Sequence, residues 1–208
     1  MHVVFREAQG LEETDVPMDL GQSPADLVVL SFSDSDLGAF SEGWKKEKEG
    51  LPSLRLANLV ALKHPLSVDT YIEQTLEKAK GILIRLIGGV QYWEYGLNQV
   101  YNLAQEKGIA LAVLPADGRE DDRLDEFSTI PKSTLLRLKN LTDTGGSKAA
   151  AAALAQLAIS AGLYAAPIIG DKALPDVGYW LPKDGVVSEF SIHNKYQLIC
   201  ITFYRSFL

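Results

Sequence analysis

Short apolar runs alternate with longer amphipathic stretches along most of this chain. The apolar runs are rich in leucine, isoleucine and valine and end at turn or capping residues, a pattern typical of buried strands. We therefore expect four strands, at residues 27–31, 54–59, 81–87 and 109–114.

The amphipathic stretches between these runs predict helices. Ser33 offers a capping side chain for a helix through Glu47, and Ser67 offers one for a helix through Lys80. A third helix is expected over 92–107, with a glycine as its stop. Because strands and helices alternate, the pattern indicates βαβ units. We predict an α/β fold with an open, mostly parallel sheet of four to five strands flanked by helices, of the Rossmann-like or flavodoxin-like type.

The pattern changes in the last third of the chain. Residues 132–141 and 145–161 predict two further helices that cover the sheet, the second of them rich in alanine. Residues 167–185 contain three prolines and three glycines, so we expect a loop or linker there. A final apolar run, 196–204, has strand character.

Composition narrows the class of protein. The formal net charge is −7, which argues against a nucleic-acid partner, because binding phosphates requires a clustered basic face. The single cysteine, Cys200, excludes an intrachain disulfide and favours a reducing, cytoplasmic setting. The acidic N-terminus does not resemble a secretory signal, and the alanine-rich run 149–161 is shorter than the ~20 residues that span a bilayer. We expect neither a membrane span nor nucleic-acid binding.

Candidate chemistry is sparse, because the sequence contains no dinucleotide-binding G-x-G-x-x-G motif and no G-x-S-x-G elbow. The pair Gly88 and Gly89 follows a predicted strand and precedes a helix, where open α/β sheets receive ligands; the alternative is a tight turn. Asp117 follows the fourth strand and belongs to an acidic patch. That patch is either a hard-cation site or, the favoured interpretation, a solvated helix start formed by Asp117, Asp121, Asp122 and Asp125.

Histidine and aromatic side chains complete the candidates. The three histidines are too far apart in sequence for a local metal motif, so no metal site is predicted. His64 faces a ligand or is bonded to nearby backbone, and the aromatic residues near position 93 either pack on the sheet or stack on a flat macrocycle. No catalytic residue is identified. The ligand-facing candidates are His64, Asp69, Gly88, Gly89, Tyr92, Trp93 and Asp117.

Three segments of the chain carry a resemblance to a known family. They contain S-L-R-L-A-N-L at 53–59 with His64-Pro65 and Tyr71, then Gly88-Gly89 with Tyr92-Trp93 and Tyr95-Gly96, then G-I-A-L-A at 108–112 with Leu114-Pro115. In this order they resemble the N-terminal region of the large subunit of aerobic, ATP-dependent cobaltochelatase, which is related to the magnesium chelatase large subunit. The resemblance covers roughly residues 19–130, with a looser continuation to the end.

The resemblance implies a role in cobalamin biosynthesis, where the enzyme inserts Co2+ into the corrin precursor hydrogenobyrinic acid a,c-diamide. It implies as partners the remainder of the large subunit and two smaller subunits that form an AAA+ motor and hold Mg-ATP. Co2+ would be a substrate, and we expect no cofactor in this chain. The competing hypothesis is a free-standing flavodoxin-like module without catalysis, which binds a small ligand near Gly88, Gly89 and Asp117 or docks to a protein.

The resemblance also suggests how the chain is divided. Members of the family are several times longer, so we expect this polypeptide to be a piece of a large subunit or a split gene product, with the catalytic residues outside it. The expected parts are an α/β head domain at 1–165, a linker or loop at 166–190, and at 191–208 a strand resembling the start of a following domain. The last strand is expected to promote self-association if its partner strands are missing.

Overall fold

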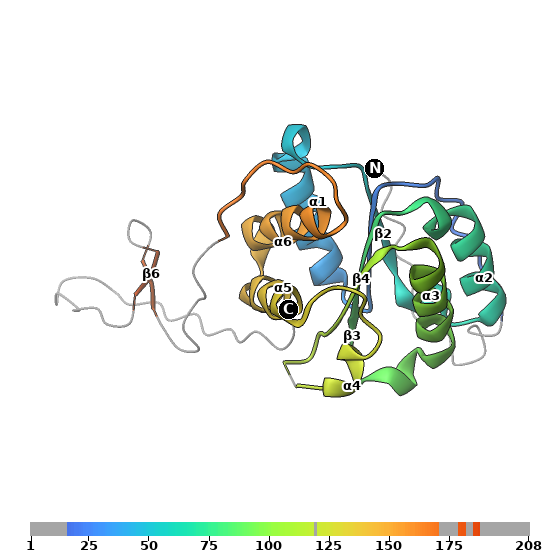
Figure 1. Ribbon diagram of the computed structural model, residues 1–208. Coiled ribbons are helices and arrows are strands. Elements are labelled where there is room, and N and C mark those ends of the chain that lie inside the picture. The colour runs from blue at the N-terminus through green and yellow to red at the C-terminus, as the bar shows by residue number, and fades with distance from the viewer. Residues whose placement is uncertain (1–15, 119, 171–178, 182–184, 188–208) are drawn as a thin grey trace.

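The computed structural model describes residues 16–118, 120–170, 179–181 and 185–187. Its centre is a sheet of four parallel strands in the order β2-β1-β3-β4 (Figure 1). The first and last residues of each strand lie within one residue of those of a predicted apolar run. The predicted open α/β fold is confirmed. The strands are β1 (Leu27–Ser31), β2 (Leu54–Asn58), β3 (Gly81–Leu86) and β4 (Ala110–Pro115).

The strand order creates a switch point. The chain passes from β1 to β2 on one side and then returns to β3 on the other side of β1. In open parallel sheets, ligands bind outside the carboxyl ends of the strands where the order reverses. The carboxyl ends of β1 and β3, at Ser31 and Leu86, mark this position.

Helices cover both faces of the sheet (Figure 1). One layer contains α1, α5 and α6, the other contains α2 and α3, and the short α4 lies beyond the carboxyl end of β4. The α-helices are α1 (Asp34–Lys46), α2 (Pro65–Gln74), α3 (Glu94–Lys107), α4 (Asp122–Asp125), α5 (Lys132–Thr144) and α6 (Gly146–Ser160). Short 3-10 turns are η2 (Lys48–Gly50), η3 (Leu59–Leu62), η4 (Leu76–Lys78) and η5 (Val90–Tyr92). Among the described residues, no helix is both long and apolar enough to cross a membrane.

Successive side chains of each strand point to opposite faces of the sheet, which produces a hydrophobic core on each face. In β1, Val28 and Leu30 pack toward the α2 and α3 layer, while Leu27 and Val29 pack toward α1, α5 and α6. Helix α6 is buried on almost every side, which explains its alanines, because small side chains allow neighbouring helices to approach closely. The closest approach is at Gly43 of α1, where an added Cβ would overlap the carbonyl oxygen of Ser147.

Both outer strands of the sheet are covered along part of their length. On β2, the Gln22 side-chain amide donates to the Leu56 carbonyl at 2.9 Å, and Gln22 in turn accepts from the Tyr71 hydroxyl at 2.9 Å. On β4, Thr129 Oγ1 accepts from the Leu111 amide at 2.8 Å. Such covering limits the addition of a strand from another chain.

Two predicted helix starts are wrong. Helix α2 begins at Pro65 with His64 as its N-cap, whereas Ser67 lies inside the helix, and α2 ends at Gln74 rather than at Lys80. Proline favours the first helical position because its fixed φ suits the helix and its missing N–H is not needed there. Helix α3 begins at residue 94 rather than 92, because the preceding residues form η5.

Downstream of α6, one prediction is corrected and others stay predictions. Strand β5 (Tyr179–Leu181) pairs antiparallel with β6 (Gly185–Val187), so the expectation of a loop throughout 167–185 is wrong at β5. The predicted strand at 196–204 and Cys200 lie outside the described residues. The proposed division at 165 and 190 stays a prediction.

Candidate functional site

The turn after β3 brings two predicted site residues together. Gly88 and Gly89 have φ values of +81° and +84°, a region that residues with a Cβ rarely adopt. The Gly88 amide donates to Asp117 Oδ2 at 3.4 Å, which joins the carboxyl ends of β3 and β4. Asp117 is therefore positioned by the glycine turn at the edge where ligands bind in this class of sheet.

Two glycines allow the aromatic rings beside this turn to lie close to the backbone. A Cβ at Gly88 would overlap the ring of Tyr92, and a Cβ at Gly96 would overlap the indole of Trp93. The indole is buried and its Nε1 donates to the Leu62 carbonyl at 2.8 Å. The expectation that these rings pack on the sheet holds for Trp93 only, because Tyr92 lies in η5 before the helix and is 62% exposed.

The aromatic residues beside the glycine turn line an open groove of about 510 Å³ between the start of α2 and the start of α3. We call it the aromatic groove; it is lined by Lys63, Gln91, Tyr92, Trp93, Glu94, Tyr95 and Gly96. The Tyr95 hydroxyl donates to Asp69 Oδ1 at 2.8 Å, and this hydrogen bond raises the pKa of Tyr95. Asp69, a predicted site residue, therefore orients a groove tyrosine.

His64 lies beside the groove in sequence but has a local structural role. Its Nδ1 accepts from the Leu66 amide at 3.1 Å, which caps the first turn of α2. Bonding to nearby backbone was one of the two interpretations open for this histidine. The cap uses one ring nitrogen and places the residue at the entrance to α2.

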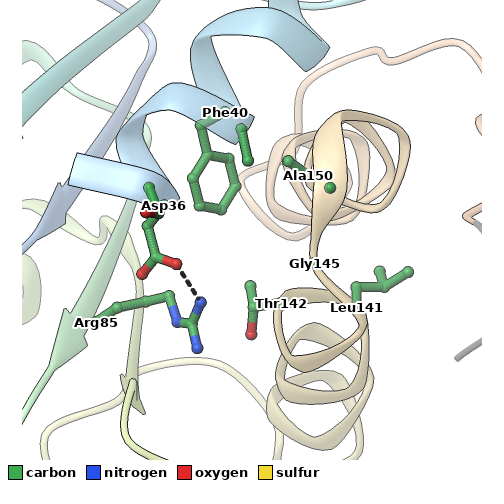
Figure 2. A pocket seen from close by; sticks show the side chains of 10 residues that line it. Asp36, Phe40, Arg85, Leu141, Thr142, Gly145 and Ala150 are labelled. Carbon is green, nitrogen blue, oxygen red and sulfur yellow. Dashed lines mark hydrogen bonds and ion pairs between the residues drawn. The ribbon is translucent and has the colours of Figure 1, made fainter. Parts of the chain in front are cut away.

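A buried ion pair lies at the switch point, on the other side of the sheet (Figure 2). Arg85 of β3 donates to Asp36 of α1 at 2.9 Å, and it also contacts Asp143 of α5 at 3.4 Å. The Ser31 hydroxyl donates to the second Asp36 oxygen at 2.9 Å. We call Ser31, Asp36, Arg85 and Asp143 the arginine cluster. It joins the ends of β1 and β3, the start of α1 and the end of α5, and burial makes the pair of Asp36 and Arg85 costly to break.

The cavity beside the arginine cluster is too small for an organic ligand. Its volume is about 20 Å³, while one water needs roughly 10–15 Å³ on the same measure. Figure 2 shows Asp36 and Phe40 of α1 on one side and Leu141 and Thr142 of α5 on the other. A cavity of this size has room for about one water molecule, so we assign the arginine cluster a structural role.

The sequence predictions missed the arginine cluster. Asp36 is not among the candidates from sequence, and Arg85 lies within a predicted apolar strand run. One signal was available, because Arg85 is the one charged residue in the run 81–87. A charged residue in a buried strand requires a partner, although sequence spacing does not identify that partner.

Three members of the acidic patch, Asp121, Asp122 and Asp125, form a helix start after β4, whereas Asp117 accepts from the Gly88 amide. Asp121 caps α4 by accepting from the Arg123 amide, and the Arg123 side chain lies 2.8 Å from its carboxylate. This side-chain hydrogen bond lowers the pKa of Asp121. Asp125 lies 3.9 Å from Lys132. Across the residues that the structure describes, no group of three or more histidine, cysteine, aspartate or glutamate side chains is arranged to hold a metal ion.

Two curated proteins and one solved structure are similar to this chain. It is 35% identical over 197 residues to the aerobic cobaltochelatase subunit CobN of Sinorhizobium sp, covering 90% of the chain and 14% of that protein. It is 37% identical over 146 residues to the protein of the same name from Pseudomonas aeruginosa, covering 70% of the chain and 12% of that protein. No protein-family model matches.

The similar structure is that of the catalytic subunit of cobaltochelatase from Mycobacterium tuberculosis. It has a TM-score of 0.58 and 22% sequence identity to this chain, over 72% of this chain and 11% of that subunit. At this identity the likeness supports the fold alone.

The chain spans about one seventh of the length of the first curated relative. The two curated relatives confirm the resemblance noted from the sequence.

Proposed function

Because this chain is homologous to one region of the aerobic cobaltochelatase subunits, we propose that it is the head domain of a cobaltochelatase large subunit in cobalamin biosynthesis. The observation that carries the proposal is the 35% identity over 90% of the chain. The enzyme is a nitrogen–metal ligase that uses ATP to insert Co2+ into hydrogenobyrinic acid a,c-diamide. Within it, this domain serves as a scaffold, lid or docking surface.

The described contacts support a non-catalytic role for the domain. Inserting a metal requires removal of two pyrrole protons and of water from the cation, so bases or metal ligands must surround the macrocycle. The arginine cluster is buried beside a cavity of about 20 Å³, and Asp69 and Asp121 are bonded to Tyr95 and Arg123. We place the reaction centre elsewhere in the large subunit and expect no turnover by this chain alone.

The proposal includes partners and a location. Two smaller subunits form an AAA+ motor and bind Mg-ATP, and the large subunit binds the corrin precursor and Co2+ as substrates. Partners and complex act in the cytoplasm. The absence of a P-loop motif from this sequence is compatible with nucleotide binding on those partner subunits.

A free-standing binding module is the second candidate, and the aromatic groove favours it. The groove has the volume of a small-ligand site and lies close to Gly88 of the glycine turn, since the Tyr92 ring contacts that residue. In this alternative the chain holds a ligand without any cobaltochelatase partner.

Titration of the purified chain with the corrin precursor, followed by absorbance, tests the scaffold role. We expect no saturable spectral change at one equivalent, because the domain lacks the reaction centre. Tight stoichiometric binding would contradict the scaffold role and favour a ligand-binding module. A titration with Co2+ alone is the matched control for weak surface binding of the metal.

A further inference from the structure

We infer that the aromatic groove, together with Val60 and Leu66, is the surface on which this domain docks against the rest of the large-subunit polypeptide. Val60 and Leu66 lie three residues on either side of Lys63, which lines the groove. The inference rests on the proposed function, since it requires a large subunit. It adds which face of the domain makes the contact.

Four large apolar side chains at or next to the groove are exposed. Val60 is 53% exposed, Leu66 54%, Tyr92 62% and Tyr95 42%. They project from η3, η5 and the first turns of α2 and α3. Exposed apolar side chains at and next to a groove favour an interaction there, because covering them removes apolar surface from water.

The groove is held in shape before any partner binds. The Tyr92 ring lies against Gly88, the Trp93 indole lies against Gly96, and the Tyr95 hydroxyl is fixed by Asp69. The bond from Trp93 to the Leu62 carbonyl joins the start of α3 to η3. A rigid surface loses little conformational entropy on binding, so this arrangement favours association with a partner.

The sheet edges are less suitable for docking. Gln22 covers the β2 edge at Leu56, and the hydroxyl groups of Ser128 and Thr129 accept from the β4 amides of Val113 and Leu111. Strand addition requires free backbone groups along an edge. Docking therefore uses side chains, and the aromatic groove provides them.

The length of the relatives indicates which partner covers the aromatic groove. The matched region is 14% of the Sinorhizobium subunit and 12% of the Pseudomonas subunit, so in these proteins most of the same polypeptide lies outside it. Interfaces between domains of one chain bury roughly 600–1,500 Å² and are partly polar. Within the described residues, neither the Lys63 ammonium group nor the Tyr92 hydroxyl has a hydrogen bond or ion pair. The partner surface is therefore apolar at its centre, with a carboxylate or carbonyl facing Lys63.

A chimera tests the inference directly. The 197-residue matched stretch of the Sinorhizobium subunit is replaced by the aligned residues of this chain, and backbone amide exchange is compared with that of the free chain. We expect exchange in residues 60–66 and 90–96 to slow by about tenfold or more in the chimera. Unchanged exchange in both segments would overturn the inference.

Variants with a matched control separate docking from general stability. Tyr92→Ser with Lys63→Glu should abolish the protection, because both side chains are exposed and lie in the groove. Tyr164→Ser should leave it unchanged, because Tyr164 is 83% exposed and follows α6 on the other layer. Equal loss of protection with the control variant would contradict a specific surface.

The same chimera distinguishes the inference from the proposed function. If it inserts cobalt but residues 60–66 and 90–96 are unprotected, the docking surface is wrong and the function stands. If the residues are protected but no cobalt is inserted, the docking surface stands and the function fails. Should the chimera not elute as the parent subunit does, the chain is added to the subunit lacking the matched stretch. The same exchange measurement on residues 60–66 and 90–96 then shows whether this surface docks against the subunit.

Discussion

Asp36 and Arg85 form an ion pair of 2.9 Å although their side chains are only 3% and 2% exposed. The pair connects α1 to β3 at the point where the strand order reverses. Both Asp36 oxygens are used, because the second accepts from Ser31 at 2.9 Å. A buried charge that loses its partner is far less stable than the pair, so this contact makes folding sensitive to either residue.

Replacement of Asp36 by alanine should destabilise the protein severely. The variant leaves the Arg85 charge buried without its main partner, and such losses cost about 3–5 kcal/mol. Urea unfolding followed by far-UV circular dichroism measures the change. The control is Glu42→Ala, which breaks an exposed pair with Lys46 and should cost no more than about 0.5 kcal/mol. Similar losses for the two variants would show that the buried pair is not special.

Two glycines of α1 should respond oppositely to alanine. Gly43→Ala should destabilise by about 1–3 kcal/mol, because the new Cβ overlaps the Ser147 carbonyl and forces α1 away from α6. Gly38→Ala should stabilise by roughly 0.5–1 kcal/mol, because nothing lies within 4 Å and alanine favours a helix. Thermal unfolding of both variants tests the pair. A stabilising Gly43→Ala would contradict the close packing of the two helices.

Tyr71 should make the protein less stable at alkaline pH. Burial raises its pKa above the ordinary value of about 10, with nearby Arg55 acting weakly in the opposite direction. The folded state therefore holds the Tyr71 proton more tightly than the unfolded state does. The contribution of Tyr71 to the free energy of unfolding is complete below pH ~10 and is lost as the pH rises further. The slope from this group approaches about −1.4 kcal/mol per pH unit.

Tyr71→Phe isolates that contribution. The variant should lose about 1 kcal/mol at neutral pH, because the hydrogen bond to Gln22 is gone, but its stability should fall less steeply above pH ~10 than that of the wild type. Tyr164→Phe, at an exposed site, should keep the wild-type slope. Identical slopes for all three proteins in urea unfolding would refute a raised pKa at Tyr71.

Local pattern was sufficient for the sheet but not for all helix boundaries. The four strands are apolar runs with turn residues at their ends, and these signals are local. Two adjacent signals competed at α2, where Pro65 after His64 prevailed over Ser67 as a helix start. At the start of α3, helical periodicity predicts a helix from residue 92, but η5 intervenes and the helix begins at residue 94.

The site was less predictable because its contacts join distant parts of the chain. The positions of Gly88, Gly89 and Asp117 at the carboxyl ends of β3 and β4 follow from local strand signals, while their ligand-facing role stays a prediction. Arg85 and Asp36 are 49 residues apart, and hydrophobic periodicity contains no information about which charged residues meet. The roles of Gly88 and Gly96 under aromatic rings likewise require the positions of those rings in space.

The central claim is that this chain acts as the head domain of a cobaltochelatase large subunit. The most direct measurement is ATP-dependent cobalt insertion by three proteins: the Sinorhizobium subunit, the same subunit without its matched 197-residue stretch, and the chimera carrying this chain there. Each is assayed with the two smaller subunits and the corrin precursor. We predict that the deletion loses cobalt insertion and that the chimera regains it. A folded chimera no more active than the deletion would contradict the account.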